Sequence, residues 1–230
     1  MLKNYFHDLL SLFFPELCTA CGKNLFKNEV VICTTCIYNL PKTDFHLDDE
    51  NRVARQLWGR FPFVQAISYL FFQKGGKVQS LMHQLKYNNS PQTGFRMGEL
   101  YGYELKRSVS FKQPDLIIPV PLHSKRLKKR GYNQSEHIAN GLGSVFNIPI
   151  VVNNLQRFEA TDTQTKKNRF ARYENLKGAF EIKNPEEFVS KHILLVDDVI
   201  TTGATLEACS LELLKINGVS ISIATIAFAE

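Results

Sequence analysis

The residues most suited to chemistry in this 230-residue sequence lie in one segment, 193–205, which reads ILLVDDVITTGAT. Asp197 and Asp198 are adjacent carboxylates, and a small loop rich in hydroxyl groups follows them: Thr201, Thr202, Gly203, Ala204 and Thr205. Backbone N–H groups and threonine hydroxyls suit a phosphate, and glycine lets the backbone approach it closely. The carboxylates would repel a bare phosphate, so we expect them to bind vicinal hydroxyls or a hydrated Mg²⁺. A sugar phosphate fits both halves of the segment.

Two elements of secondary structure must position this segment. Residues 193–196 are an uninterrupted apolar run, typical of a strand that is buried on both faces in a parallel sheet. Two aspartates end this run, at the carboxyl edge where open α/β sheets usually bind ligands. The apolar residues of 206–216 recur at roughly helical spacing, so the loop is predicted to be a helix N-terminus. The alternative, two solvated aspartates followed by a threonine cap, explains either half but not the full run.

Basic stretches elsewhere in the chain are candidate anion-binding groups. Residues 116–120 read as a buried strand, and the basic loop after it is predicted to face the same sheet edge as the aspartates. Such a loop could receive a pyrophosphate or a nucleic-acid backbone, and a solvated run of charges is the alternative. Residues 149–182 start as a short apolar strand and continue as a long polar stretch, which we interpret as a mobile hairpin and a basic lid. The candidate cations are Lys86, Lys125, Arg126, Lys128, Lys129, Arg130, Lys166, Lys167 and Arg169.

Four of the five cysteines form two C-x2-C pairs, and they are Cys18, Cys21, Cys33 and Cys36. Each x2 spacing lets two thiolates meet one ion, and four sulfurs with no open position describe a structural zinc site. Two disulfides are the alternative, although nothing in the sequence indicates an oxidising compartment. Cys209 is expected to be a core residue.

The rest of the chain predicts an ordinary globular protein. Its 44% hydrophobic content is enough for a packed core, and its net charge of +6 suits anionic partners without requiring them. Residues 1–17 predict a short helix, since a signal peptide there would lack a small-residue cleavage site. Residues 42–60 read as a linker, 63–73 and 219–229 as strands, and 78–88 as a helix. No apolar run reaches the roughly 18 residues of a transmembrane helix, so we expect a cytoplasmic protein.

Residues 193–205 resemble the ribose-phosphate signature of the type I phosphoribosyltransferases, which has an apolar strand, two acidic residues and a T-T-G-x-T loop. The resemblance implies that Asp197 and Asp198 bind the ribose hydroxyls of phosphoribosyl pyrophosphate and that 201–205 bind its 5′-phosphate. It also implies a Mg²⁺ ion that accompanies this ligand. It names neither an acceptor nor a catalytic residue.

Nearly the whole chain resembles the ComF (GntX-like) family. The segments that carry the resemblance are LFFPELCTACG, CTTC, QLKY, PVPLHSKRLKKRGYNQSEHIA, TDTQTKKNRFARYENLKGAF and LLVDDVITTGATLEA. In that family a zinc finger precedes a phosphoribosyltransferase-like domain. The resemblance implies an N-terminal helix and zinc ribbon in 1–45 and a doubly wound parallel α/β domain in 46–230.

Three functions follow from this resemblance. Some family members support natural competence, so the first is a ComF-like protein that binds phosphoribosyl pyrophosphate or a related nucleotide and handles single-stranded DNA during uptake. The second is an active phosphoribosyltransferase, and the third is a nucleotide sensor without turnover. The family also implies a helicase-type competence partner, and a homodimer is compatible with the sequence.

Overall fold

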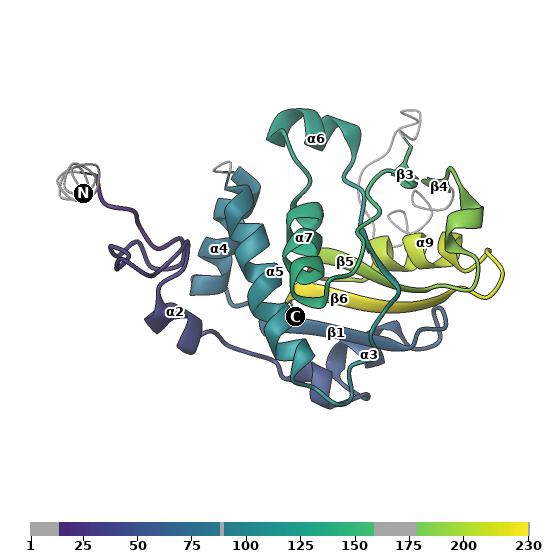
Figure 1. Cartoon of the computed structure of the whole chain (residues 1–230), viewed down its shortest axis with the longest axis horizontal. Coiled ribbons are helices and arrows are strands. Elements are labelled where there is room, and N and C mark those ends of the chain that lie inside the picture. Colours follow the sequence, from purple (N-terminus) through teal and green to yellow (C-terminus); the bar gives the residue numbers. More distant parts are fainter. Residues whose placement is uncertain (1–13, 88–89, 159–178, 230) are drawn as a thin grey trace.

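Four parallel strands form the central sheet of this computed structural model, which describes residues 14–87, 90–158 and 179–229 (Figure 1). The strands are ordered β1-β6-β5-β2 across the sheet. Their bounds are β1 Gln65–Phe71, β2 Leu116–Pro119, β5 His192–Ile200 and β6 Ser220–Phe228. Strand β5 therefore lies inside the sheet, and its carboxyl end is central to the sheet edge.

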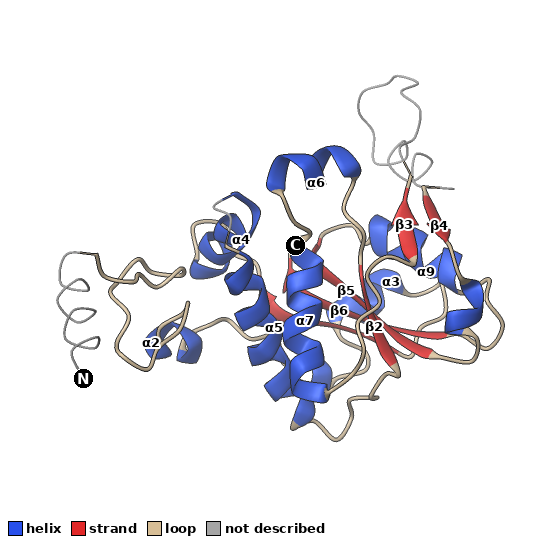
Figure 2. Cartoon of the chain, turned by 45° about the horizontal axis from the view of Figure 1, so that its top comes forward, coloured by secondary structure: helices blue, strands red, loops and turns tan. Residues whose placement is uncertain are grey.

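Helices cover both faces of the sheet (Figures 1 and 2). Helices α5 and α7 lie on the face turned toward the viewer in Figure 1, with α4 beside α5, while α3 and α9 lie on the far face. Their bounds are α3 Arg52–Leu57, α4 Lys77–Tyr87, α5 Pro91–Lys106, α7 Gln134–Phe146 and α9 Ala204–Leu213. This arrangement confirms the predicted doubly wound parallel α/β fold.

Shorter elements complete the described chain. They are α2 Thr34–Tyr38, α6 Ser124–Arg130, β3 Leu155–Arg157, β4 Phe180–Ile182 and two 3-10 helices, Phe45–Leu47 and Pro185–Phe188. Among the helices of the described ranges, none is long and apolar enough to cross a membrane. The helix predicted in 1–17 falls mostly outside the described residues.

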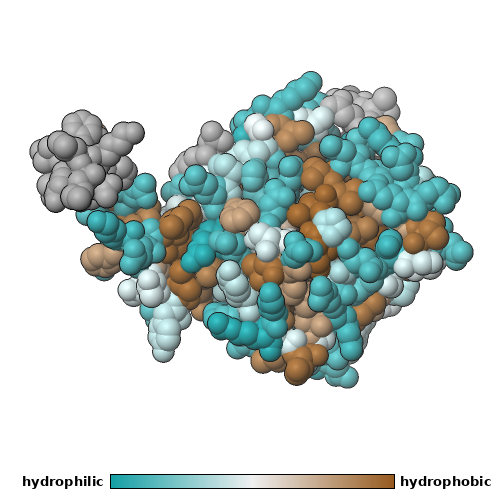
Figure 3. Space-filling view, in the orientation of Figure 1, coloured by the Kyte–Doolittle hydropathy of each residue, from teal (hydrophilic) through white to brown (hydrophobic). Residues whose placement is uncertain are grey.

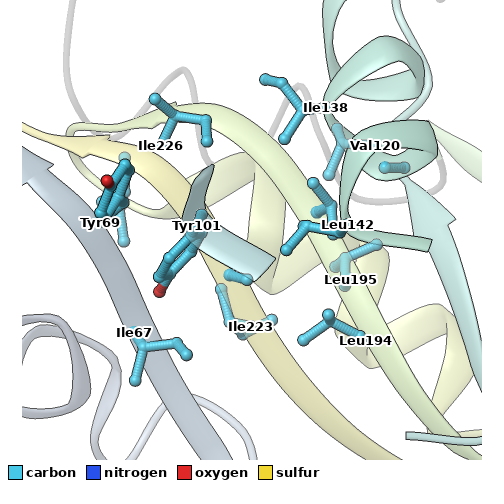
Figure 4. Packing of buried hydrophobic residues seen from close by; sticks show 14 of the residues in the cluster. Ile67, Tyr69, Tyr101, Val120, Ile138, Leu142, Leu194, Leu195, Ile223 and Ile226 are labelled. Carbon is cyan, nitrogen blue, oxygen red and sulfur yellow. The ribbon is translucent and has the colours of Figure 1, made fainter. Parts of the chain in front are cut away.

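The core lies between the sheet and its helices, and it explains the apolar strand sequences. Leu194 and Leu195 of β5 and Ile223 of β6 are fully buried, because both faces of these strands are covered (Figure 4). Tyr101 of α5 stacks on Tyr69 of β1 with ring centroids 4.9 Å apart. The uninterrupted apolar runs therefore predicted the buried strands correctly.

Strand β5 is longer than the apolar run alone predicted. Asp197 remains in register with Thr225 of β6, and Ile200 with Phe228. The two aspartates consequently belong to the last part of the strand and do not follow its end.

The predicted linker at 42–60 is wrong, because it contains a packed helix. Val53 and Leu57 of α3 are fully buried. Asn51 caps α3 by accepting hydrogen bonds from the backbone N–H groups of Val53 and Ala54, while its own amide donates to Ala66 O of β1 at 3.0 Å. A six-residue helix is too short to show a periodic pattern, and this one is anchored by its contacts with the sheet.

Candidate functional site

The two acidic residues at the end of β5 are held by partners from other elements. Asp197 Oδ1 accepts a hydrogen bond of 2.9 Å from the Ser135 hydroxyl, in the first turn of α7, and one of 2.8 Å from Asp198 N–H. Asp198 Oδ2 lies 3.0 Å from Lys86 Nζ, in the last turn of α4. Two elements that are distant in sequence, α4 and α7, thus meet the pair on β5.

Burial raises the pKa of Asp197 to about 7, and the adjacent charge of Asp198 adds to this shift. The N–H of Asp198, the hydroxyl of Ser135 and the charge of Lys86 oppose it. A carboxyl group with such a pKa changes its charge near neutral pH, so a cation or hydroxyl donor that binds beside it would favour its ionised form.

The loop 201–205 follows β5 as predicted, and its last two residues already belong to the first turn of α9. Gly203 has φ of 73°, in the left-handed region that favours glycine, and it immediately precedes the first helical residue, Ala204. Together with Asp197, the loop lines a hollow of about 40 Å³. The sheet edge therefore places a helix N-terminus next to a carboxylate, the arrangement that the sequence predicted.

The predicted basic loop after β2 is instead a two-turn helix, α6. The ring nitrogen Nδ1 of His123 accepts a hydrogen bond from Lys125 N–H at its start, and Gly131 ends it with φ of 81°. Hydrophilic side chains gather over α6 on the surface of the molecule (Figure 3). The run of charged residues concealed this helix because α6 has no buried residue that would produce an amphipathic pattern.

An open cavity of about 480 Å³ lies between α4 and α6 and is lined by Lys86, Tyr87, Arg126, Lys129 and Arg130. Arg130 is fixed there, since it donates to Gln134 Oε1 at 2.8 Å and its guanidinium lies 5.6 Å from the centroid of the Tyr87 ring. Lys125 and Lys128 are absent from the lining, so the cations of α6 divide between two faces. Tyr87 was not predicted as a site residue.

The sequence profile of the phosphoribosyl transferase domain matches residues 127–230. Competence protein F of Haemophilus influenzae is 36% identical over 147 residues, which are 62% of this chain and 64% of that protein. DNA utilization protein YhgH of Salmonella typhimurium is 32% identical over 217 residues, 93% of this chain and 91% of that protein. The chain belongs to the ComF family. Among solved structures, adenine phosphoribosyltransferase from Leishmania tarentolae is 13% identical with a TM-score of 0.40, covering 82% of this chain and 94% of that one.

The stretch 149–182 of this ComF family member, predicted to be a mobile hairpin and a basic lid, is described only at its two ends, 149–158 and 179–182. Strands β3 and β4 pair antiparallel, as expected for the two ends of a hairpin, and the short apolar strand expected after residue 149 is a single bridge between Ile117 and Ile150. Lys166, Lys167 and Arg169 lie outside the described residues. In the first of these ends, burial is the main cause that lowers the pKa of Arg157. Arg157 is one of the basic residues of the stretch that was predicted to be a lid.

Two residues of the region first read as a linker contact the phosphate-sized loop. Arg60 Nη1 donates to Thr202 O at 2.6 Å, and Gln56 Nε2 donates to Thr201 O. Arg60 also forms an ion pair with Glu207 of α9. No sequence signal identified these residues, because their partners are more than 140 positions away.

The four cysteines of the ComF family finger form one cluster whose ligand atoms all lie within 4.8 Å of one another. A tetrahedral zinc ion with Zn–S bonds of about 2.3 Å separates its sulfurs by about 3.8 Å. Cys21 Sγ and Cys33 Sγ are 3.9 Å apart, and Cys33 N–H donates to Cys18 Sγ at 3.3 Å. The cluster therefore fits a structural metal such as zinc. The fifth cysteine, Cys209, is buried in the core as expected.

Proposed function

We propose that this ComF family member binds phosphoribosyl pyrophosphate or a closely related nucleotide. In this proposal Asp197 and Asp198 bind the ribose hydroxyls or a Mg²⁺ ion, and the loop 201–205 binds the 5′-phosphate. Lys86 and the cations of α6 that line the cavity bind the pyrophosphate. The oxygen ligands of the acidic pair suit Mg²⁺, which would supply charge neutralisation for the phosphates.

One observation supports this proposal above the others. Lys86 Nζ contacts Asp198 Oδ2 at 3.0 Å and also lines the cavity with Arg126, Lys129 and Arg130. The acidic pair therefore adjoins a cationic cavity through Lys86 and the phosphate-sized loop through Asp197. A ligand with a phosphate at one end, a vicinal diol in the middle and a pyrophosphate at the other end matches that order.

We also propose that the protein supports DNA uptake and natural transformation by handling single-stranded DNA, together with a helicase-type partner. Two relatives are named as competence and DNA utilization proteins. Helix α6 carries five cations within seven residues, more than one pyrophosphate can use, and the exposed Lys128 lies outside the cavity lining. A zinc ribbon in 1–45 and a sugar-phosphate domain in 46–230 are the proposed division of the chain.

The two ligands are proposed to occupy different surfaces. DNA has no 2′-hydroxyl, and its internal 3′-oxygens are esterified to phosphates that carboxylates repel. The acidic pair thus favours a ribose with free hydroxyls, whereas the outer side of α6 suits a phosphate backbone of any sequence.

The decisive experiment titrates the purified protein separately with phosphoribosyl pyrophosphate plus Mg²⁺ and with a single-stranded oligonucleotide, followed by an assay for pyrophosphate release. We expect saturable binding of the sugar phosphate and salt-dependent binding of DNA. Pyrophosphate release with an added acceptor would instead identify an active transferase. Binding of nucleotides alone would identify the sensor, and absence of sugar-phosphate binding would contradict the proposal.

A further inference from the structure

Two residues that follow the zinc finger in the sequence, Gln56 and Arg60, donate hydrogen bonds to the loop 201–205. We infer that they are positioning residues for this loop. They orient the peptide groups of the loop so that backbone N–H groups face a bound phosphate. This inference rests on the proposed role of the loop as a 5′-phosphate site and adds the residues that give the loop its geometry.

Arg60 holds the loop through a fixed guanidinium. Its Nη1 donates to Thr202 O at 2.6 Å, while its Nε donates to Glu207 Oε2 at 2.8 Å. Glu207 is only 4% exposed and lies in the first turn of α9. One arginine, three residues after the end of α3, therefore links the loop to α9. Gln56 adds a second donor, directed at Thr201 O.

Because the peptide bond is planar, these contacts also fix the direction of the neighbouring backbone N–H groups. Every described peptide bond is trans, and in a trans peptide the C=O and the N–H point in opposite directions. Because donors on the α3 side hold the carbonyls of Thr201 and Thr202, the N–H groups of Thr202 and Gly203 point away from α3. Adjacent N–H groups aimed at one side are the geometry that an anion requires.

Gly203 lets the loop lie directly against its support. A Cβ atom at Gly203 would be 2.7 Å from Leu57 Cδ2 and 3.1 Å from Arg60 Nη1, which leaves no room for a side chain. The support is itself anchored, since Asn51 at the start of α3 donates to Ala66 O in β1. The orientation of the loop therefore depends on α3 as well as on its own sequence.

The test replaces the arginine without leaving a buried charge. Arg60→Met alone would strand the carboxylate of Glu207, so we pair it with Glu207→Gln, and Gln56→Leu serves as an independent second variant. Arg55→Met is the matched control, because Arg55 is an arginine of α3 next to Gln56, with an exposed side chain and a long ion pair of 3.6 Å to Glu50. Melting temperatures establish that each variant is folded.

The readout is the NMR shift of the Thr202 and Gly203 amides during titration with inorganic phosphate. We expect both amides to respond in the wild type and in Arg55→Met, and phosphate affinity to fall by about tenfold or more in the Arg60→Met/Glu207→Gln variant and in Gln56→Leu. Binding of pyrophosphate alone, at the cavity, should stay unchanged. A general loss of structure would weaken the binding of both phosphate and pyrophosphate, and this result would overturn the inference.

Two further outcomes would also overturn it: an undiminished amide response in the variants, or no response in the wild type. Binding of phosphoribosyl pyrophosphate, measured by calorimetry, tests the proposed function separately. If the wild type failed to bind this ligand while its amides still responded to phosphate in an Arg60-dependent way, the proposed function would fall and the positioning role would stand.

Discussion

Lys86 Nζ lies 3.0 Å from Asp198 Oδ2, so a cation at the end of α4 contacts an anion near the end of β5. Both side chains are largely buried, at 26% and 14% exposed, which weakens solvent screening of the pair. The contact joins the acidic pair to the cavity under α6. A ligand that carries both hydroxyls and phosphates can engage both partners at once.

The first prediction concerns Asp198→Asn. We expect weaker binding of phosphoribosyl pyrophosphate with Mg²⁺, because the variant loses a charge-assisted hydrogen bond of roughly 1.5–3 kcal/mol, about ten- to a hundredfold in affinity. Calorimetry measures the affinity, and Glu186→Gln, an exposed acidic residue, is the control. Equal affinities for Asp198→Asn and wild type would show that the pair does not bind the ligand.

The second prediction uses adjacent lysines on different faces of α6. Lys129 lines the cavity and Lys128 does not, although both are exposed. We expect Lys129→Glu to weaken binding of phosphoribosyl pyrophosphate more than Lys128→Glu does, because only the first reverses a charge inside the cavity.

The same two variants test the DNA surface. Affinity for single strands should fall by about 0.7 log unit per log unit of salt for each phosphate neutralised, and Lys128→Glu should flatten this slope. Fluorescence anisotropy across a salt series gives the slope. Salt-independent or undetectable DNA binding by the wild type would remove the nucleic-acid part of the proposal.

The third prediction concerns the cysteine cluster. We expect about one zinc per chain by elemental analysis, and we expect Cys36→Ser to lose it, because a small finger has too little core to fold without metal. Cys209→Ala is the matched control, since Cys209 lies outside the cluster and should leave the zinc content unchanged. Wild-type protein that is free of metal yet ordered in this region would contradict the prediction.

The fourth prediction is a pH dependence of stability. The pKa of Asp197 is raised from 3.8 to about 7 by burial and by Asp198, so the folded protein retains a proton that the unfolded chain releases. The free energy of unfolding should therefore fall as the pH rises from about 4 to about 7, and then level off. Asp197→Asn should flatten this dependence in urea unfolding measured in magnesium-free buffer at pH 5 and pH 8.

The exposed Asp49→Asn is the control for this fourth prediction. If the wild type and Asp197→Asn lost the same stability between the two pH values, the proposed titration of Asp197 would be wrong. A loss of pH dependence in the control as well would point to a general effect of charge.

The sequence alone predicted the elements that depend on residues close together in the chain. The apolar run 193–196 predicted a buried strand, and the small residues after it predicted a helix N-terminus. The C-x2-C pairs indicated a shared metal site, and the four sulfurs are indeed together. In each case the residues that determine the structure are close in sequence. A short apolar run is buried as one strand, and a tight turn brings two cysteines to one ion.

Only the tertiary structure revealed the elements that depend on distant partners. Helix α5 contains Gly98, where a Cβ would lie 2.2 Å from Ile138 O of α7, and at Gly141 of α7 a Cβ would lie 2.1 Å from Phe95 O. Glycine lowers helix propensity, yet here it permits two backbones to touch, so the local pattern gave no sign of α5. The same reason applies to Arg60 and Lys86. Their roles come from partners that are 142 or more and 112 positions away, respectively, and only packing of the sheet brings those partners within hydrogen-bonding distance.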